Sequence, residues 1–371
     1  MEKRTARYRV RYRLADGTVG TDSWHPTKAA AELRCKQVEV EQALDTYLDP
    51  ALGRITLAEW VAIWEPGHIA GPAKWAAYRS HLRNHILPRF GDTPLNQITR
   101  QSVKVFVKHL KQHLADSSVA SVMSLFSLLM REAVIDRRIP YNPCHGVKVI
   151  TRRADERPHA TPAQVNEIAS RIDRFSDQIL VITAAYTGMR WGELAGLART
   201  NTHLDDGMLR VDPKVGALHE VAGELYLGPP KTPDSARDVH IPPFLVGLLR
   251  QVLDGHDHDQ VFCGARGGLL RRSSMSRRVF GPAVNGNQRN GLPPVIAGMH
   301  FHDLRHTHKT WLIEDDIPEV AQAQRLGHRL AGVRGIYSHV TPAMRQRIVD
   351  ALQARWEAHQ PGRTANPPIA A

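Results

Sequence analysis

The chain has 371 residues and a formal net charge of +12, from 49 lysines and arginines against 37 acidic residues. This length provides for two or three domains with real cores, and the positive charge favours a polyanionic partner, nucleic acid above all. The longest apolar run, 179–187, is too short to span a bilayer, and the charged N-terminus is unlike a signal peptide. Single cysteines at Cys35, Cys144 and Cys263 fit a reducing compartment, so we expect a cytoplasmic protein with no membrane partner.

The N-terminal residues predict a small basic sheet followed by a helix. Residues 8–14 read YRVRYRL, in which arginine alternates with apolar or aromatic residues, as in a strand with one basic face. Asp16-Gly17 is a tight-turn signal, and 18–24 then reads as the returning strand. Thr27 can cap a helix over 29–44, which is rich in helix formers. This arrangement suits a reader of a DNA groove; the alternative is a hairpin that only packs on the next domain.

Residues 56–147 predict a helical unit. Thr56 can cap a first amphipathic helix, and a second one over 75–87 is expected to end at Pro88, because proline cannot continue a helix. Two further amphipathic helices are expected over 99–114 and 117–135. Such a unit by itself is compatible with any helical bundle.

Beyond residue 150, helical and extended segments alternate. An apolar run at 179–186 leads into the sequence TGMRWGELAGL. Between expected strands at 224–227 and 237–241, a turn-rich loop carries Lys231, as in a hairpin. The remaining elements are a strand at 208–211, helices at 244–253, 273–279 and 342–356, and a tail from residue 360 that is expected to be disordered.

One short C-terminal stretch, 299–340, contains His302, Arg305, His328 and Tyr337. On a helix, the spacing of His302 and Arg305 puts both side chains on one face, and the glycine before His328 can end a helix. A guanidinium binds phosphate with two prongs, an imidazole moves protons near neutral pH, and a phenol can be a nucleophile. The set predicts phosphoryl transfer to a tyrosine, which needs further cations elsewhere in the chain.

Other candidates are ambiguous when taken alone. Arg190 follows the flexible Thr187-Gly188 step, and Glu193 lies three residues further on, where it can hold the guanidinium by an ion pair. An ordinary surface pair at this spacing contributes little, and by itself this interpretation is favoured. A single lysine on a hairpin, such as Lys231, is likewise usually exposed to solvent.

Taken in order, the motifs TGMRWGEL, PPKT, HDLRHT, LGH and YSH strongly resemble those of the tyrosine recombinases, the family of phage integrases and Xer-type resolvases. Their order, local context and spacing all agree with the family. One departure is visible, because Tyr337 follows His328 at a step one residue shorter than the commonest family spacing. No tyrosine other than Tyr337 lies beyond Tyr226, so nothing competes for its role.

The resemblance implies six catalytic residues, and no cofactor or metal: Arg190, Lys231, His302, Arg305, His328 and Tyr337. The tyrosine would attack a DNA phosphate, leaving a 3′-phosphotyrosyl link and a free 5′ hydroxyl. The two arginines would clamp the non-bridging oxygens, and the lysine would protonate the leaving oxygen. His302 would take the tyrosine proton or assist its transfer, and His328 would hydrogen-bond the phosphoryl group. Glu193 would hold Arg190, and His306 would be structural or an accessory near the phosphate.

The expected fold class is mainly α with small β-sheets (α+β), centred on a tyrosine-recombinase catalytic domain. The resemblance implies an arm-type DNA-binding domain at 1–52, a helical core-site DNA-binding domain at 53–150, a linker at 151–159, a catalytic domain at 160–358 and a disordered tail at 359–371. Implied partners are double-stranded DNA with core and arm attachment sites, a homotetramer on that DNA, an excision factor and a host DNA-bending protein. Expected DNA contacts are Arg9, Arg11, Arg13, Arg79, Arg83, Arg271, Arg272, Arg277 and Arg278.

Several alternatives stay open. The string HDLRH resembles the zinc-protease pattern HExxH, with His302 and His306 four residues apart, but it has Asp in place of Glu and an arginine beside the site. A DNA-binding regulator could keep the fold without cleavage. Among enzymes, an Xer-like resolvase is the runner-up, against which the extra basic N-terminal domain argues. A type IB topoisomerase fits the chain organisation less well.

Overall fold

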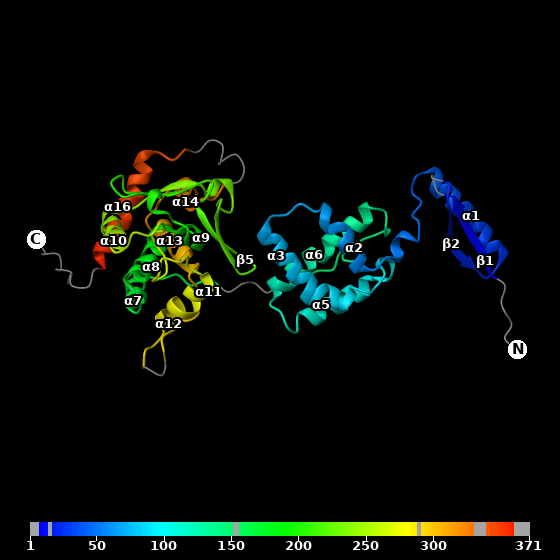
Figure 1. The fold of residues 1–371 in the computed structure, drawn as a ribbon, viewed down its shortest axis with the longest axis horizontal. Coiled ribbons are helices and arrows are strands. Elements are labelled where there is room, and N and C mark those ends of the chain that lie inside the picture. The colour runs from blue at the N-terminus through cyan, green and yellow to red at the C-terminus, as the bar shows by residue number, and fades with distance from the viewer. Residues whose placement is uncertain (1–6, 14–16, 151–155, 288–290, 330–338, 360–371) are drawn as a thin grey trace, which may run out of the picture. The chain divides into compact units, whose positions relative to one another are not determined.

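The computed structural model describes residues 7–13, 17–150, 156–287, 291–329 and 339–359, and Tyr337 and the tail from residue 360 lie outside them. The chain forms two compact units, an N-terminal unit within 1–154 and a C-terminal unit within 155–371, and each is described by itself. Helices dominate both units, and the described sheets have two or three strands (Figure 1). The predicted fold class, mainly α with small β-sheets, is therefore confirmed. The three-domain division stays a prediction.

The N-terminal unit begins with a two-stranded sheet, β1 (Tyr8–Arg13) and β2 (Val19–His25), which pair antiparallel. Helix α1 (Lys28–Ala43) follows and packs on both strands, and Thr27 Oγ1 accepts a hydrogen bond from the Ala30 amide at 3.3 Å. Alternate residues of β1 are buried, so its arginines share the exposed face. The predicted strand with one basic face is confirmed.

The rest of the N-terminal unit is a helical bundle. A capping box formed by Thr56 and Glu59 starts the first helix, as the sequence predicts. Apolar faces of the helices meet in one core that includes the aromatic trio Phe90, Phe106 and Phe126. The helices of the bundle are α2 (Leu57–Trp64), α3 (Pro72–His81), α4 (Leu87–Phe90), α5 (Arg100–Leu110) and α6 (Asp116–Ile135).

Pro88 does not end a helix, which corrects the sequence prediction. A π-helical turn, Leu82–Ile86, joins α3 to α4, and the Leu87 amide closes it by donating to the Leu82 carbonyl. Pro88 comes next, at the start of α4, where a missing N–H costs no hydrogen bond. The helical path therefore continues to Phe90.

Helix α6 is long and apolar enough to cross a membrane by length and composition. Its apolar side chains instead pack in the core of the bundle, where Phe126 and Leu129 are fully buried. Trp60 Nε1 also donates to the Leu129 carbonyl at 3.0 Å. We therefore interpret α6 as the core helix of the N-terminal unit.

The C-terminal unit surrounds helix α8, whose residues are almost all buried. Helices α7 and α13 lie beside α8 (Figure 1). Tyr186, near the end of α8, packs edge-on against Trp311, Phe244 and Trp356. The helices are α7 (Pro162–Ser170), α8 (Phe175–Thr187), α9 (Trp191–Ala195), α10 (Pro243–Asp254), α11 (Arg272–Ser274), α12 (Gly281–Asn285), α13 (Asp303–Glu314), α14 (Glu319–Leu326) and α16 (Pro342–Ala358).

In the described part of this unit, two small antiparallel sheets accompany the helices. One has the order β3-β4-β7 and the other pairs β5 with β6. The predicted hairpin around Lys231 is therefore wrong: β6 and β7 belong to different sheets, and the loop between them is a crossover. The sequence prediction also missed β3 and β5. The strands are β3 (Thr202–His203), β4 (Met208–Val211), β5 (Ala217–Val221), β6 (Glu224–Gly228) and β7 (Arg237–His240).

Candidate active site

Arg190 lies at the junction between α8 and α9. Helix α8 ends at Gly188, which adopts the left-handed conformation at φ 64°, and Arg190 is the N-terminal cap of α9. Its Nη1 donates to Glu193 Oε1 at 2.8 Å and to Ser235 Oγ at 2.9 Å. The Arg190 amide donates to the other carboxylate oxygen of Glu193 at 2.9 Å. Hydrogen bonds therefore fix both the backbone amide and the guanidinium group of Arg190.

The spacing of Arg190 and Glu193 in the sequence, taken alone, favours an ordinary surface ion pair. That interpretation is wrong, because Glu193 is buried. Its side chain is 2% exposed, and its Oε2 also accepts from Arg237 Nη2 at 3.0 Å. Burial by itself raises the pKa of the Glu193 carboxyl. The charge of Arg237 and the hydrogen bonds from Arg237 and Arg190 have a larger, opposite effect, so the pKa is lowered overall. One buried carboxylate therefore holds two guanidinium groups in place.

Arg305 lies in the first turn of α13 and is 6% exposed. Its Nη1 donates to the Gly188 carbonyl at 2.6 Å, and its Nη2 donates to the Leu326 carbonyl and, at 2.8 Å, to His328 Nε2. Burial, together with the nearby charges of Arg190 and Arg237, lowers the Arg305 pKa to about 9. At neutral pH the guanidinium keeps its charge in a desolvated site.

His328 follows the left-handed Gly327 that ends α14, as the sequence predicts. A Cβ at Gly327 would lie 3.0 Å from both Ser235 Cα and Arg237 Nη1, so this close packing requires glycine. Partial burial and the charge of Arg305 lower the His328 pKa, which favours a neutral imidazole. Because Nε2 accepts from Arg305, the hydrogen-bond network assigns the ring proton to Nδ1.

His302 lies immediately before α13, with an exposed side chain. Partial desolvation lowers its pKa, and the charges of His306, Arg305 and Arg190 act in the same direction. The neutral imidazole can accept a proton. His306, one turn further on, is also exposed and packs edge-on against His302 with ring centroids 5.5 Å apart.

The two remaining predicted catalytic residues are Lys231 and Tyr337. Lys231 is exposed on the crossover loop and makes no hydrogen bond or ion pair with the described residues. The loop itself is anchored, because Thr232 Oγ1 shares a 2.8 Å hydrogen bond with Ser235 Oγ, which contacts Arg190. Tyr337 lies outside the described residues. The structure thus brings Arg190, Glu193, His302, Arg305 and His328 together.

Sequence reasoning missed Ser235 and Arg237 in this cluster. Arg237 lies two residues before the buried Val239 on β7, so both side chains share one face, and an arginine on the buried face of a strand was the available signal. Its side chain is 4% exposed. A buried arginine on such a face requires a partner, which here is Glu193.

Comparison with known proteins decides the family. Residues 159–344 match the phage integrase family, and residues 56–111 match the phage integrase N-terminal SAM-like domain. The chain belongs to the phage integrase family. Its function is that of a site-specific tyrosine recombinase, an enzyme, and the zinc-protease alternative for HDLRH has no support in this assignment.

Relatives of this integrase span most of its length. A putative prophage phiRv2 integrase of Mycobacterium tuberculosis is 29% identical over 301 residues, covering 77% of this chain and 74% of the relative. The integrase of Mycobacterium phage L5 is 24% identical, covering 91% and 88%. A XerC-like tyrosine recombinase of Caldanaerobacter subterraneus is 24% identical, covering 88% and 90%.

Solved structures share the fold of this integrase. The Tn1549 transposon integrase in complex with a circular intermediate DNA has a TM-score of 0.63 at 19% identity, covering 82% of this chain and 99% of that one. A lambda integrase tetramer bound to a Holliday junction has a TM-score of 0.55 at 18% identity, covering 89% and 95%. These likenesses agree with the fold class.

The nine arginines predicted to contact DNA are all exposed, but the side chains of three of them also have partners among the described residues. Arg9 lies over the Trp24 ring at 5.5 Å, and Arg79 donates to Glu65 at 2.9 and 3.1 Å. Arg271 donates to the Gly223 carbonyl at 2.7 Å, which ties it to the β5–β6 hairpin. Contact of these nine residues with DNA stays a prediction.

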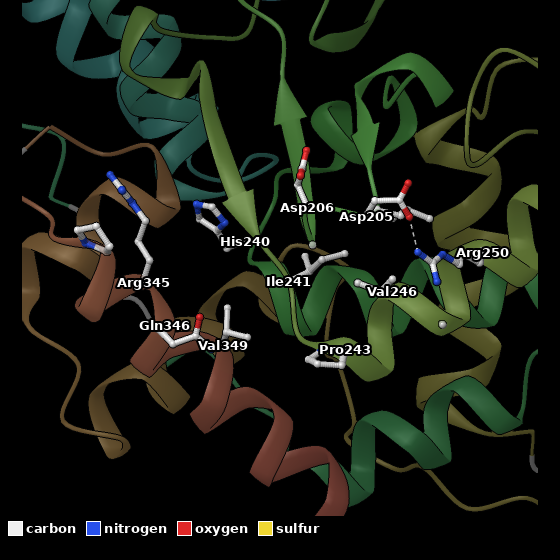
Figure 2. Close-up of a pocket in the computed structure, with 14 residues that line it drawn as sticks. Asp205, Asp206, His240, Ile241, Pro243, Val246, Arg250, Arg345, Gln346 and Val349 are labelled. Carbon is white, nitrogen blue, oxygen red and sulfur yellow. Dashed lines mark hydrogen bonds and ion pairs between the residues drawn. The ribbon is translucent and has the colours of Figure 1, made fainter.

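A separate hollow of about 650 Å³ lies between the end of β7, α10 and the start of α16 (Figure 2). Asp205 and Arg250 form an ion pair of 2.6 Å at one end, and His240 and Arg345 lie toward the other. None of the described residues that line it is a predicted catalytic residue. The arginine cluster is therefore distinct from this hollow.

Proposed function

We propose that this recombinase cuts and rejoins DNA through a covalent 3′-phosphotyrosyl intermediate formed by Tyr337, and that it integrates or excises a phage or mobile element. The observation that carries the proposal is the arginine cluster: the guanidinium groups of Arg190, Arg237 and Arg305 lie around one carboxylate, Glu193. The guanidinium groups of Arg190 and Arg305 each donate three hydrogen bonds to described residues, which leaves two of the five N–H donors of each group for a ligand. Such an excess of fixed positive charge suits a phosphate whose charge grows in the transition state.

The proposed roles follow from this arrangement. Arg190 and Arg305 clamp the non-bridging oxygens of the scissile phosphate. His302, neutral because of its lowered pKa, takes the Tyr337 proton or assists its transfer. His328 offers its Nδ1 proton to the phosphoryl group, while Nε2 stays bonded to Arg305.

Lys231 is the proposed general acid, which protonates the 5′ oxygen as it leaves. Glu193 holds Arg190, and His306 supports His302. The phosphodiester energy is conserved in the tyrosyl link, so the 5′ hydroxyl of a second DNA end can reverse the step without ATP.

The proposed working form is a homotetramer on two DNA duplexes in the cytoplasm, with an excision factor and a host DNA-bending protein as accessory partners. Each exchange needs four cleavages, and each chain offers one Tyr337. The lambda integrase tetramer on a Holliday junction supports this form. The basic hairpin of β1 and β2 supports an arm-site role and favours an integrase over an Xer-like resolvase.

Covalent capture tests the proposed function. The integrase is mixed, in EDTA, with supercoiled DNA that carries the region flanking its gene, and the products are resolved in SDS with and without protease. We expect a protease-sensitive protein–DNA adduct that Tyr337→Phe abolishes and Tyr226→Phe, at a tyrosine on β6, leaves intact. Tight DNA binding without any adduct, even on nicked trapping substrates, would favour the non-catalytic regulator.

A second prediction concerns the leaving group. Lys231→Ala is expected to slow cleavage of an ordinary phosphodiester by about 10²–10⁴-fold, the usual contribution of a general acid. On a substrate with sulfur in place of the 5′ bridging oxygen, the rate should approach that of the wild type, because a thiolate leaves without protonation. Lys214→Ala, at another exposed lysine of the same unit, should cleave both substrates normally. Equal losses on both substrates would remove Lys231 from this role.

A further inference from the structure

Three consecutive carbonyl groups at the end of α14 each accept a hydrogen bond from a different arginine. The Arg325 carbonyl accepts from Arg237 Nε at 2.6 Å, the Leu326 carbonyl accepts from Arg305 Nη2, and the Gly327 carbonyl accepts from Arg190 Nη2 at 3.4 Å. Carbonyls at a helix C-terminus lack partners within the helix and carry partial negative charge. The end of α14 therefore serves as an acceptor for all three guanidinium groups.

The side chain that fixes this end of α14 is Arg325, which is buried at 6% exposure. Its Nε donates to His308 Nε2 at 2.8 Å, its Nη1 to the His240 carbonyl at 2.7 Å and its Nη2 to the Tyr186 carbonyl at 2.9 Å. These partners belong to α13, β7 and α8. One guanidinium thus joins the elements that carry Arg305 and Arg237 to the helix that immediately precedes Arg190.

His308 completes this arrangement from α13. Its Nδ1 contacts the Ala185 carbonyl at 2.8 Å and must donate there, so Nε2 is free to accept from Arg325 in a neutral ring. The ring also packs against Gly188, where a Cβ would come within 2.7 Å of His308 Cδ2. Gly188 in turn offers its carbonyl to Arg305.

The acceptors of Arg325 are all neutral, and among the described residues no carboxylate pairs with it. Burying a guanidinium without a counter-ion lowers the stability of the folded protein through desolvation. If only packing were required, an apolar side chain could fill the same space without this loss. The three hydrogen bonds donated by the Arg325 guanidinium fix the orientation of the backbone at 325–327, which an apolar side chain cannot do.

We propose that Arg325, held by His308, is a positioning residue for strand cleavage, which acts by orienting the α14 carbonyl groups that aim Arg190, Arg237 and Arg305. Neither side chain contacts DNA in this scheme. The inference rests on the proposed function, in which Arg190 and Arg305 clamp the scissile phosphate.

The test measures the rate of adduct formation and DNA affinity in two variants. His308→Asn keeps a donor for the Ala185 carbonyl and loses the acceptor of Arg325, and Arg325→Met removes all three donors. Both are expected to slow adduct formation by about 10²-fold, the cost of a misplaced catalytic group. Their DNA affinity should stay within about threefold, because buried side chains make no phosphate contacts. An exposed control, Arg250→Met, should leave the rate unchanged.

A double-mutant cycle separates positioning from general loss of structure. In an Arg305→Gln background, either variant should add clearly less loss than it causes in the wild-type background, since one of the groups being positioned is already gone. Multiplied losses, or single variants with wild-type rates, would overturn the proposal. If Arg325→Met does not fold, His308→Asn decides the question by the same comparison.

Hydrogen exchange gives a readout that does not depend on activity. The amides of Gly327 and His328, bonded to the Gln324 and Ala323 carbonyls at 3.0 and 2.9 Å, should lose protection in both variants while the melting temperature changes little. Unchanged protection would overturn the inference. An absence of adduct in the wild type would instead refute the proposed function, and the exchange measurement would still decide the role of Arg325.

Discussion

Replacing Glu193 with glutamine is expected to destabilise the C-terminal unit by about 3–5 kcal/mol, the usual effect of breaking a buried ion pair by removing one partner. The carboxylate is 2% exposed and contacts both Arg190 and Arg237. In the variant, amide hydrogens would face guanidinium hydrogens, and the buried Arg237 and the half-buried Arg190 would lose their counter-ion. A change of about 3 kcal/mol corresponds to roughly 6–12 °C in melting temperature for a unit of this size.

Thermal unfolding of the variant and of a matched control checks this prediction. Glu167→Gln breaks the pair with Arg171, in which the glutamate is 51% exposed, and such a pair contributes at most about 1 kcal/mol. The control should therefore melt close to the wild type. Equal melting temperatures for the two variants would show that Glu193 is not the central counter-ion of the cluster.

The pH dependence of the same variant gives a second check. The Glu193 pKa is lowered from its usual 4.5 in the folded protein, so between that lowered value and 4.5 the unfolded chain binds more protons. The stability that Glu193 contributes is therefore complete above about pH 4.5 and is lost as the pH falls through the folded pKa. Glu193→Gln should lose this part of the acid dependence, while Glu167→Gln should retain it.

Much of the fold could be predicted from sequence, because the signals involved are local. Thr27 and Thr56 cap helices as expected, Gly327 ends a helix in the left-handed conformation, and the alternating pattern of β1 gives the right strand. These features depend on neighbours within a few residues. The order of the chemical motifs is also a property of the sequence alone.

Strand pairing and the buried partners of the site were not predictable in the same way. The segments that form β6 and β7 are both strand-like, but only the tertiary structure pairs them with β5 and β4. Arg237 and Arg325 look like ordinary basic residues until distant elements bury them. Likewise, the passage of a helix through Pro88 depends on a π-helical turn that has no simple sequence signature.

Arg305→Gln is expected to reduce the rate of adduct formation by about 10²–10³-fold, the usual effect of removing one group that stabilises charge in a transition state. DNA affinity should change little, since many phosphate contacts share it. The melting temperature should stay the same or rise. Burial and the charges of Arg190 and Arg237 lower the Arg305 pKa to about 9. The charged guanidinium therefore destabilises the folded protein. The buried charge of Arg305 therefore contributes to phosphate binding and not to the stability of the fold. Arg305→Lys should remain slow, because an ammonium cannot form the same fork. A loss of stability as large as that of Glu193→Gln would instead make Arg305 a structural residue.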